Sequence, residues 1–133
     1  FDSRRLNMLL AVLEKRVGLK MYQKDVFLNF AGGFKINDTG LDAGIIAAIL
    51  SSYFDRPLDP KCCYAGEVGL SGEIRPATRS EQRISEAARL GFHRIVVSGY
   101  LRKTLPNPPK GIEIIYVNKL DELARILFRS AES

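Results

Sequence analysis

The sequence predicts a mixed α/β domain, of the α/β or α+β type, from three observations. Leucines at helical spacing predict an amphipathic helix from Ser3 to Val17. The turn 37–40 opens onto a nearly all-apolar stretch that runs to about Phe54, and a helix this apolar must be buried by the rest of the chain. Two later strand–helix units favour parallel pairing of their strands, so helices and a parallel sheet should share one core.

The middle of the chain predicts two further β features. Segment 26–30 is rich in β-branched and aromatic residues and predicts a strand, and the pair Gly32-Gly33 then allows the backbone to bend. Residues 62–68 and 73–75 predict the two arms of a hairpin around the bend 70–72, because Gly and Ser favour a turn between the two runs.

The second half predicts alternating helices and strands. Gly91 marks a helix stop, and the helix before it should turn Ile84, Ala87 and Ala88 inward. The apolar centre of the following strand is typical of burial on both faces. The expected elements are a helix over 79–90, a strand over 93–98, a strand over 112–117, and a helix from the cap Asn118 to about Phe128.

Composition limits the possible classes of protein. The 133 residues suit a single domain, 1–133, with 46% hydrophobic and 26% charged residues, as in soluble globular proteins. No apolar run reaches the roughly 18 residues of a membrane span. The adjacent pair Cys62-Cys63 and the single histidine, His93, predict neither a disulfide nor a metal site, and a reducing cytoplasm fits them. Since the sequence begins with Phe1, we expect a piece of a longer protein.

Basic residues form the first group of candidate functional residues. The net charge of +5 permits a nucleic-acid partner without requiring one. These side chains could bind phosphates, pair with acids of a neighbouring subunit, or face water. Aromatic residues do not alternate with them as in proteins that bind single strands. The DNA-binding candidates are Arg75, Arg79, Arg83, Arg102 and Lys103.

Two acids form the second group. Thr39 and Asp42, like Thr78 and Glu81, have the spacing of a capping box, in which each partner bonds a backbone N–H at a helix start. The alternative is a pair of carboxylates for acid–base chemistry. His93 opens a strand and has no nucleophile motif around it, so a structural or surface role is expected.

Two motifs resemble the protease domain of the Lon family. Residues 41–44 resemble the segment that opens its catalytic helix, and residues 66–76 resemble the hairpin that leads to its catalytic lysine. The resemblance covers most of the chain from Val26 on and implies the ribosomal protein S5 domain 2-like fold. Asp42 stands where that family has its serine, and Glu81 where it has its lysine. Two carboxylates cannot replace a serine–lysine dyad, so a protease fold without catalytic residues is implied.

A more specific resemblance is to the RadA (Sms) family of bacterial DNA repair proteins. It rests on residues 1–16, together with 29–33, 51–52 and the hairpin. The family implies a zinc finger and an ATPase upstream, which would hold Zn, ATP and Mg, whereas this domain would hold no cofactor. It also implies strands before residue 1 whose absence leaves a sheet edge unpaired.

The resemblance implies a non-proteolytic Lon-like domain that acts in ring assembly and DNA contact. The parent protein would form a hexameric homo-oligomer on single-stranded or branched DNA, in the cytoplasm and away from membranes, and would drive branch migration. Two alternatives stay open: a Lon-like serine peptidase with an altered active site, and a purely oligomerising scaffold.

Overall fold

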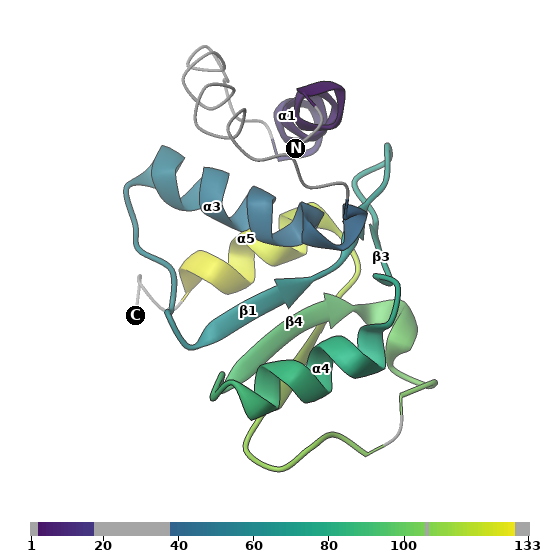
Figure 1. Ribbon diagram of the computed structural model, residues 1–133. Helices are drawn as coiled ribbons and strands as arrows, with labels where there is room; N and C mark the ends of the chain where they lie inside the picture. Colours follow the sequence, from purple (N-terminus) through teal and green to yellow (C-terminus); the bar gives the residue numbers. More distant parts are fainter. Residues whose placement is uncertain (1–2, 18–37, 106, 130–133) are drawn as a thin grey trace.

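The computed structural model describes residues 3–17, 38–105 and 107–129, and a parallel sheet lies at its centre (Figure 1). The sheet consists of β1 (Cys62–Ala65), β4 (Arg94–Ser98) and β5 (Glu113–Val117), in the order β1-β4-β5. Both strand pairs are parallel, including the two late strands for which the sequence predicts it. The α/β class is therefore confirmed, while the S5 domain 2-like subclass stays a prediction.

The sheet lies between two layers of helices (Figure 1). The side chains of β4 alternate between these layers. Val96 packs in the layer that contains α1 (Ser3–Val17), α3 (Asp42–Phe54) and α5 (Leu120–Arg129). Ile95 and Val97 pack in the opposite layer, against α4 (Ser80–Arg89). All three side chains are at most 2% exposed, so the predicted burial of this strand on both faces is confirmed.

Helix α3 contacts α1, α5, β1 and the short strand β2 (Glu67–Val68). Its side chains Ile46, Ala47 and Leu50 are 0% exposed, and burying an Ile or Leu contributes about 1.5–3 kcal/mol. Asp55, with a φ of 52°, ends the helix in the left-handed conformation. The predicted bounds of α1 and α3 are confirmed, and the apolar stripe of α1 is buried at Leu9, Leu10 and Leu13.

The predicted hairpin over 62–76 is wrong in its first arm. Only β2 (Glu67–Val68) and β3 (Ile74–Arg75) pair in antiparallel fashion, whereas β1 joins the parallel sheet. Gly66 separates the two: its N–H donates to the Gly40 carbonyl at 3.0 Å, and its carbonyl accepts from Ala43 N–H at 3.0 Å. A Cβ at Gly66 would lie 2.8 Å from the Ile74 side chain, so the close approach requires glycine.

The later elements agree with the prediction to within one or two residues at each end. Helix α4 begins at Ser80, because Arg79 takes the left-handed conformation with a φ of 55°. Gly91, with a φ of 91°, follows the helix as predicted. Before α5, the backbone N–H of Asn118 donates to the Glu122 carboxylate at 2.9 Å.

Two short 3-10 helices complete the described fold: η1 (Thr39–Leu41) and η2 (Gly99–Leu101). None of the described helices is long and apolar enough to cross a membrane. The predicted strand 26–30 and the Gly32-Gly33 pair lie outside the described residues.

Candidate functional site

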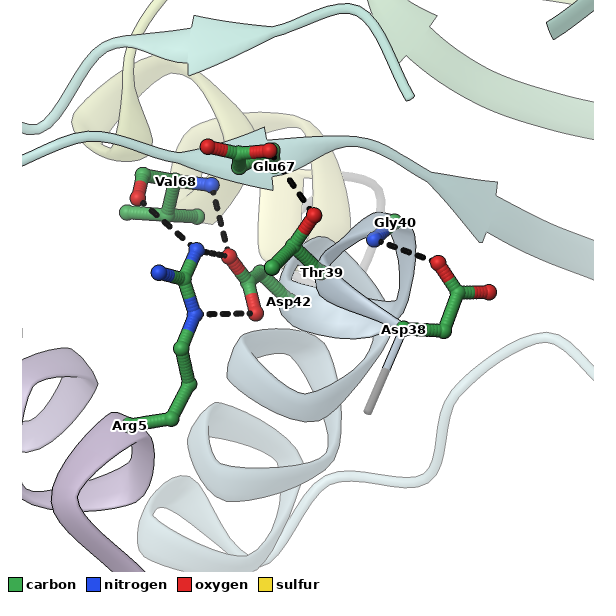
Figure 2. Close-up of polar contacts among 7 residues, drawn as sticks. All are labelled: Arg5, Asp38, Thr39, Gly40, Asp42, Glu67 and Val68. Carbon is green, nitrogen blue, oxygen red and sulfur yellow. Dashed lines mark hydrogen bonds and ion pairs between the residues drawn. The ribbon is translucent and has the colours of Figure 1, made fainter. Parts of the chain in front are cut away.

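Asp42, at the start of α3, is fully buried and holds an ion pair with Arg5 of α1 (Figure 2). Its Oδ1 accepts from Arg5 Nε at 3.2 Å, and its Oδ2 accepts a second, short bond from the same guanidinium. The Val68 N–H donates to Oδ2 at 3.0 Å. Hydrogen bonding to Asp42 raises the pKa of Arg5, so the guanidinium stays charged. We name these three residues the Asp42 cluster.

The start of α3 is also bonded to the β1–β2 junction. Thr39 Oγ1 donates to Glu67 Oε2 at 2.8 Å (Figure 2), beside the two backbone bonds of Gly66 described above. Together with the Asp42 cluster, these bonds join α1, α3 and β2 at one point. The arrangement holds the start of α3 in place. It leaves the Asp42 carboxylate paired and buried, whereas nucleophilic catalysis needs an accessible side chain.

Both predicted capping boxes are wrong. Asp38, rather than Thr39, accepts from the Gly40 N–H, at 2.9 Å, and the Asp42 carboxylate turns inward to Arg5. At α4, the residue before the helix is Arg79, and no side chain caps the helix start. The Asp42 carboxylate pairs with the distant Arg5 instead of capping locally, because it is fully buried and has no water to bind.

The structure does not join Asp42 to Glu81. Glu81 is exposed in the first turn of α4 and lines a shallow pocket with Asn107 and Pro108, in the layer opposite α3. Within the described ranges, no hydrogen bond or ion pair links the two carboxylates. The acid–base pair is therefore not formed, and the reading of both positions as a degenerate dyad stays a prediction.

Arg83, unlike the other basic candidates, is held by partners on two sides. Its Nε donates to the Thr78 carbonyl at 2.7 Å, and it forms an ion pair with Asp38 at 2.9 Å. The guanidinium lies so close to Gly40 that a Cβ there would meet it at 2.8 Å. Arg79 directly precedes α4, and its carbonyl accepts from the Arg83 N–H at 3.0 Å. Arg83 thus joins α4 to the start of α3.

The other four candidates are exposed and sit on elements at one end of the sheet. The carboxyl ends of parallel strands meet at one edge, and η2 follows β4 there (Figure 1). Strand β3 contacts η2, and Ser98 Oγ donates to the Ile74 carbonyl at 2.7 Å. Arg75 lies 3.6 Å from Glu73. We call these exposed cations the basic edge: Arg75, Arg79, Arg102 and Lys103.

Tyr100 is a candidate that the sequence does not single out. It lies in η2 and is 66% exposed, two residues before Arg102. Arg102 itself stacks over the Tyr116 ring, 4.7 Å from its centroid. One exposed aromatic residue therefore stands beside the basic edge, although aromatic residues do not alternate with the basic ones along the chain. The run Tyr-Leu-Arg-Lys, with an aromatic residue close to two cations, is the sequence signal that could have identified Tyr100 as a candidate.

Neither cysteine offers a reactive thiol. Cys62 and Cys63 are free and half-buried, and burial raises the pKa of Cys63 to about 11, so the thiolate is scarce at neutral pH. His93 is exposed, and its backbone bonds to Lys61 and Glu113, which fits the expected structural role. Within the described part of the chain, no three His, Cys, Asp or Glu residues gather as metal ligands.

The Asp42 cluster should be a strong stabilising contact. We expect Asp42→Ala to lower the free energy of unfolding by about 2–4 kcal/mol, because it leaves the Arg5 charge and the Val68 N–H without their partner. A double-mutant cycle with Arg5→Ala should give a coupling energy of about 1–3 kcal/mol. The measurement is urea unfolding followed by circular dichroism. Asp38→Ala, which breaks a more exposed ion pair, is the control and should cost about 1 kcal/mol or less. Equal losses from the two substitutions would contradict this ranking.

The Asp38–Arg83 pair should make stability depend on acid pH. Hydrogen bonding to Arg83 lowers the pKa of Asp38 in the folded state, below an unfolded value of about 3.9. The pair therefore stabilises fully above that unfolded value, and its contribution is lost as pH falls through the folded pKa. Asp38→Asn, which can still accept from Gly40 N–H, should be less stable by up to about 1 kcal/mol at pH 7 and equal at low pH.

Urea unfolding at pH 7 and at pH 2.5–3 measures the difference, which should shrink at the lower pH, since those conditions are about 3 units above and about 1 unit below the unfolded value. In an Arg83→Gln background, Asp38→Asn should have no further pH-dependent effect. A loss of the same size at both pH values would show that the ion pair is not the cause.

Comparison with known proteins identifies the family. The family described as subunit ChlI of Mg-chelatase matches residues 4–100. The chain is 43% identical over 129 residues to DNA repair protein RadA of Bacillus subtilis, covering 93% of this chain and 27% of that protein. It is 43% identical to the RadA protein of Streptococcus pneumoniae, covering 96% and 30%, and 42% identical to that of Pseudomonas aeruginosa, covering 96% and 28%.

The chain thus spans under a third of the length of these curated relatives. The family match does not bear on the Lon-like designation, which stays a prediction. The match over 4–100 includes the Asp42 cluster, the hairpin β2–β3 and helix α4. The chain belongs to the family described as subunit ChlI of Mg-chelatase, and it is similar over nearly its whole length to proteins named DNA repair protein RadA.

Proposed function

We propose that this chain is a non-proteolytic, Lon-like domain of a RadA-type DNA repair protein, and that it contacts DNA through the basic edge. The observation that carries the proposal is the gathering of exposed cations at one end of the sheet: Arg75, Arg79, Arg102 and Lys103. Exposed Lys and Arg side chains bind phosphates without reading sequence, and they release condensed counterions when they do so. Similarity to relatives named for DNA repair supports DNA as the phosphate-bearing partner.

The Asp42 cluster supports the non-proteolytic part of the proposal. A serine–lysine dyad needs an accessible hydroxyl and a lysine that can act as its base. Asp42 is 0% exposed and saturated with hydrogen bonds from Arg5 and Val68. Glu81 lies apart from it, on α4. The position that would hold the nucleophile is used here to join helices.

The parent protein would be a DNA-dependent ATPase of the cytoplasm that forms a hexameric ring and drives branch migration. ATP, Mg and Zn would bind in its upstream domains. In such a ring, the basic edge of each subunit would add phosphate contacts along the same strand. Repeated weak contacts raise the overall affinity without any one of them being strong. This domain would therefore serve as a scaffold that keeps DNA on the ring.

DNA binding should depend on the basic edge. We expect the double variant Arg75→Ala/Lys103→Ala of the full-length protein to bind single-stranded DNA more weakly, because two phosphate contacts are lost. The slope of log affinity against log salt should fall by about 1.5, since each contact contributes about 0.7–0.9. Fluorescence anisotropy of a labelled oligonucleotide over a salt series measures both quantities.

A matched control comes from the other end of the sheet. Lys61 precedes β1 and Lys110 precedes β5, and both side chains are exposed. Lys61→Ala/Lys110→Ala removes the same charge and should leave the salt slope unchanged. Equal effects of the two variants would show that DNA binding depends on net charge and not on the position of the basic edge. Absent or salt-insensitive binding, with the ring mass intact, would favour a purely oligomerising scaffold.

The chain should show no peptidase activity. We expect no cleavage of casein above the buffer blank by the full-length protein. Asp42→Ser/Glu81→Lys, which places the dyad residue types at the two positions, should also remain inactive, because the structure does not bring the two side chains together. Gel electrophoresis of casein after overnight incubation measures this. Robust cleavage by the unaltered protein would reverse the non-proteolytic assignment.

A further inference from the structure

We propose that Tyr100 is a stacking platform for an unpaired base, and that the basic edge therefore binds single-stranded DNA in preference to duplex. This inference rests on the proposed function and names the form of DNA that the basic edge accepts. It starts from a tyrosine that is 66% exposed, in η2 at the carboxyl end of the sheet. Arg102 and Lys103 follow it two and three residues later in the chain, and Arg75 lies on strand β3, which contacts η2.

The backbone that carries Tyr100 is held firmly. Ser98 Oγ accepts from the Tyr100 N–H at 3.2 Å and donates to the Ile74 carbonyl at 2.7 Å, which ties η2 to β3. The Arg102 N–H donates to the Gly99 carbonyl at 3.1 Å. Gly99 also packs so closely against Asn118 that a Cβ would collide with the amide oxygen. A ring on a fixed backbone loses little conformational freedom when a ligand stacks on it.

The surrounding charges suit a strand whose bases are unpaired. A base stacked on an aromatic ring contributes about tenfold or more to affinity, and it does so whichever base it is. The phosphates on either side of that base would meet cations from two elements, Arg75 of β3 and Lys103 after η2. Arg102 is ordered by its contact with the Tyr116 ring, which keeps its charge at this surface.

Duplex DNA cannot use the same ring. Its bases are already stacked within the helix, so a side chain that approaches from outside meets mainly phosphates and sugars. Duplex would therefore bind through the cations alone, with the affinity that counterion release provides. The contribution of Tyr100 should appear only where a base is free to leave the stack.

The test uses the full-length protein with Tyr100→Ala, and with Tyr100→Phe as the matched control that keeps the ring. Three probes are compared by fluorescence anisotropy at fixed salt: an oligo-dT strand, an abasic strand of the same length, and a duplex. Tyr100→Ala should weaken oligo-dT binding about tenfold, whereas Tyr100→Phe should stay within about twofold. Neither substitution should change binding of the abasic strand or the duplex, and the salt slopes should not change.

The outcomes separate this inference from the proposed function. If the unaltered protein binds oligo-dT and Tyr100→Ala leaves that binding unchanged, the stacking role is excluded while the basic edge stands. An equal loss on the abasic strand, or a lower mass of the assembly by light scattering, would also overturn the stacking role, because Tyr100 would then act on the fold or between subunits. If the unaltered protein binds none of the three probes, the proposed function itself fails.

Discussion

The ion pair between the buried Asp42 and Arg5 is the contact on which the rest of the described structure depends. A carboxylate without exposure is costly, and it is tolerated here because a guanidinium and the Val68 N–H satisfy it. Through Val68 the pair positions β2, and β2 pairs with β3. The Ile74 carbonyl of β3 accepts from Ser98, which in turn caps η2. One charge pair is therefore connected, step by step, to the surface that carries the basic edge.

The same pair separates the two candidate functions of the domain. A helix start that opens near a strand end is a common place for catalytic groups, and here it is closed by hydrogen bonds to α1 and β2. What remains open is the carboxyl end of the sheet, where cations from β3, the start of α4 and η2 face solvent. Cations at a surface can attract polyanions, whereas charges within the core affect the stability of the fold. The arrangement thus supports the proposed binding role.

Local sequence patterns predict the helices correctly, but they do not predict which strands pair or which side chains bond to each other. Helical spacing predicts α1, and an apolar run after a turn predicts α3, because both signals need only neighbouring residues. The capping box at Thr39 and Asp42 is wrong because the competing partner, Arg5, lies 37 residues away. The predicted hairpin is wrong in its first arm because β1 finds a parallel partner, β4, beyond helix α4. The exposure of Tyr100 could not be predicted, because the exposed fraction of a side chain depends on which distant segments pack beside it.

Chain patterns alone were enough for the class of fold, the order of its elements, the apolar helix at its core and the basic character of its candidate residues. Tertiary packing decided which charged side chains form ion pairs within the fold and which stay exposed to solvent. Among the five basic candidates, Arg83 is taken up by Asp38, while Arg75, Arg79, Arg102 and Lys103 stay exposed. The physical reason is that a side chain's free energy depends on its water and its partners, and distant segments supply the partners only once the chain is folded.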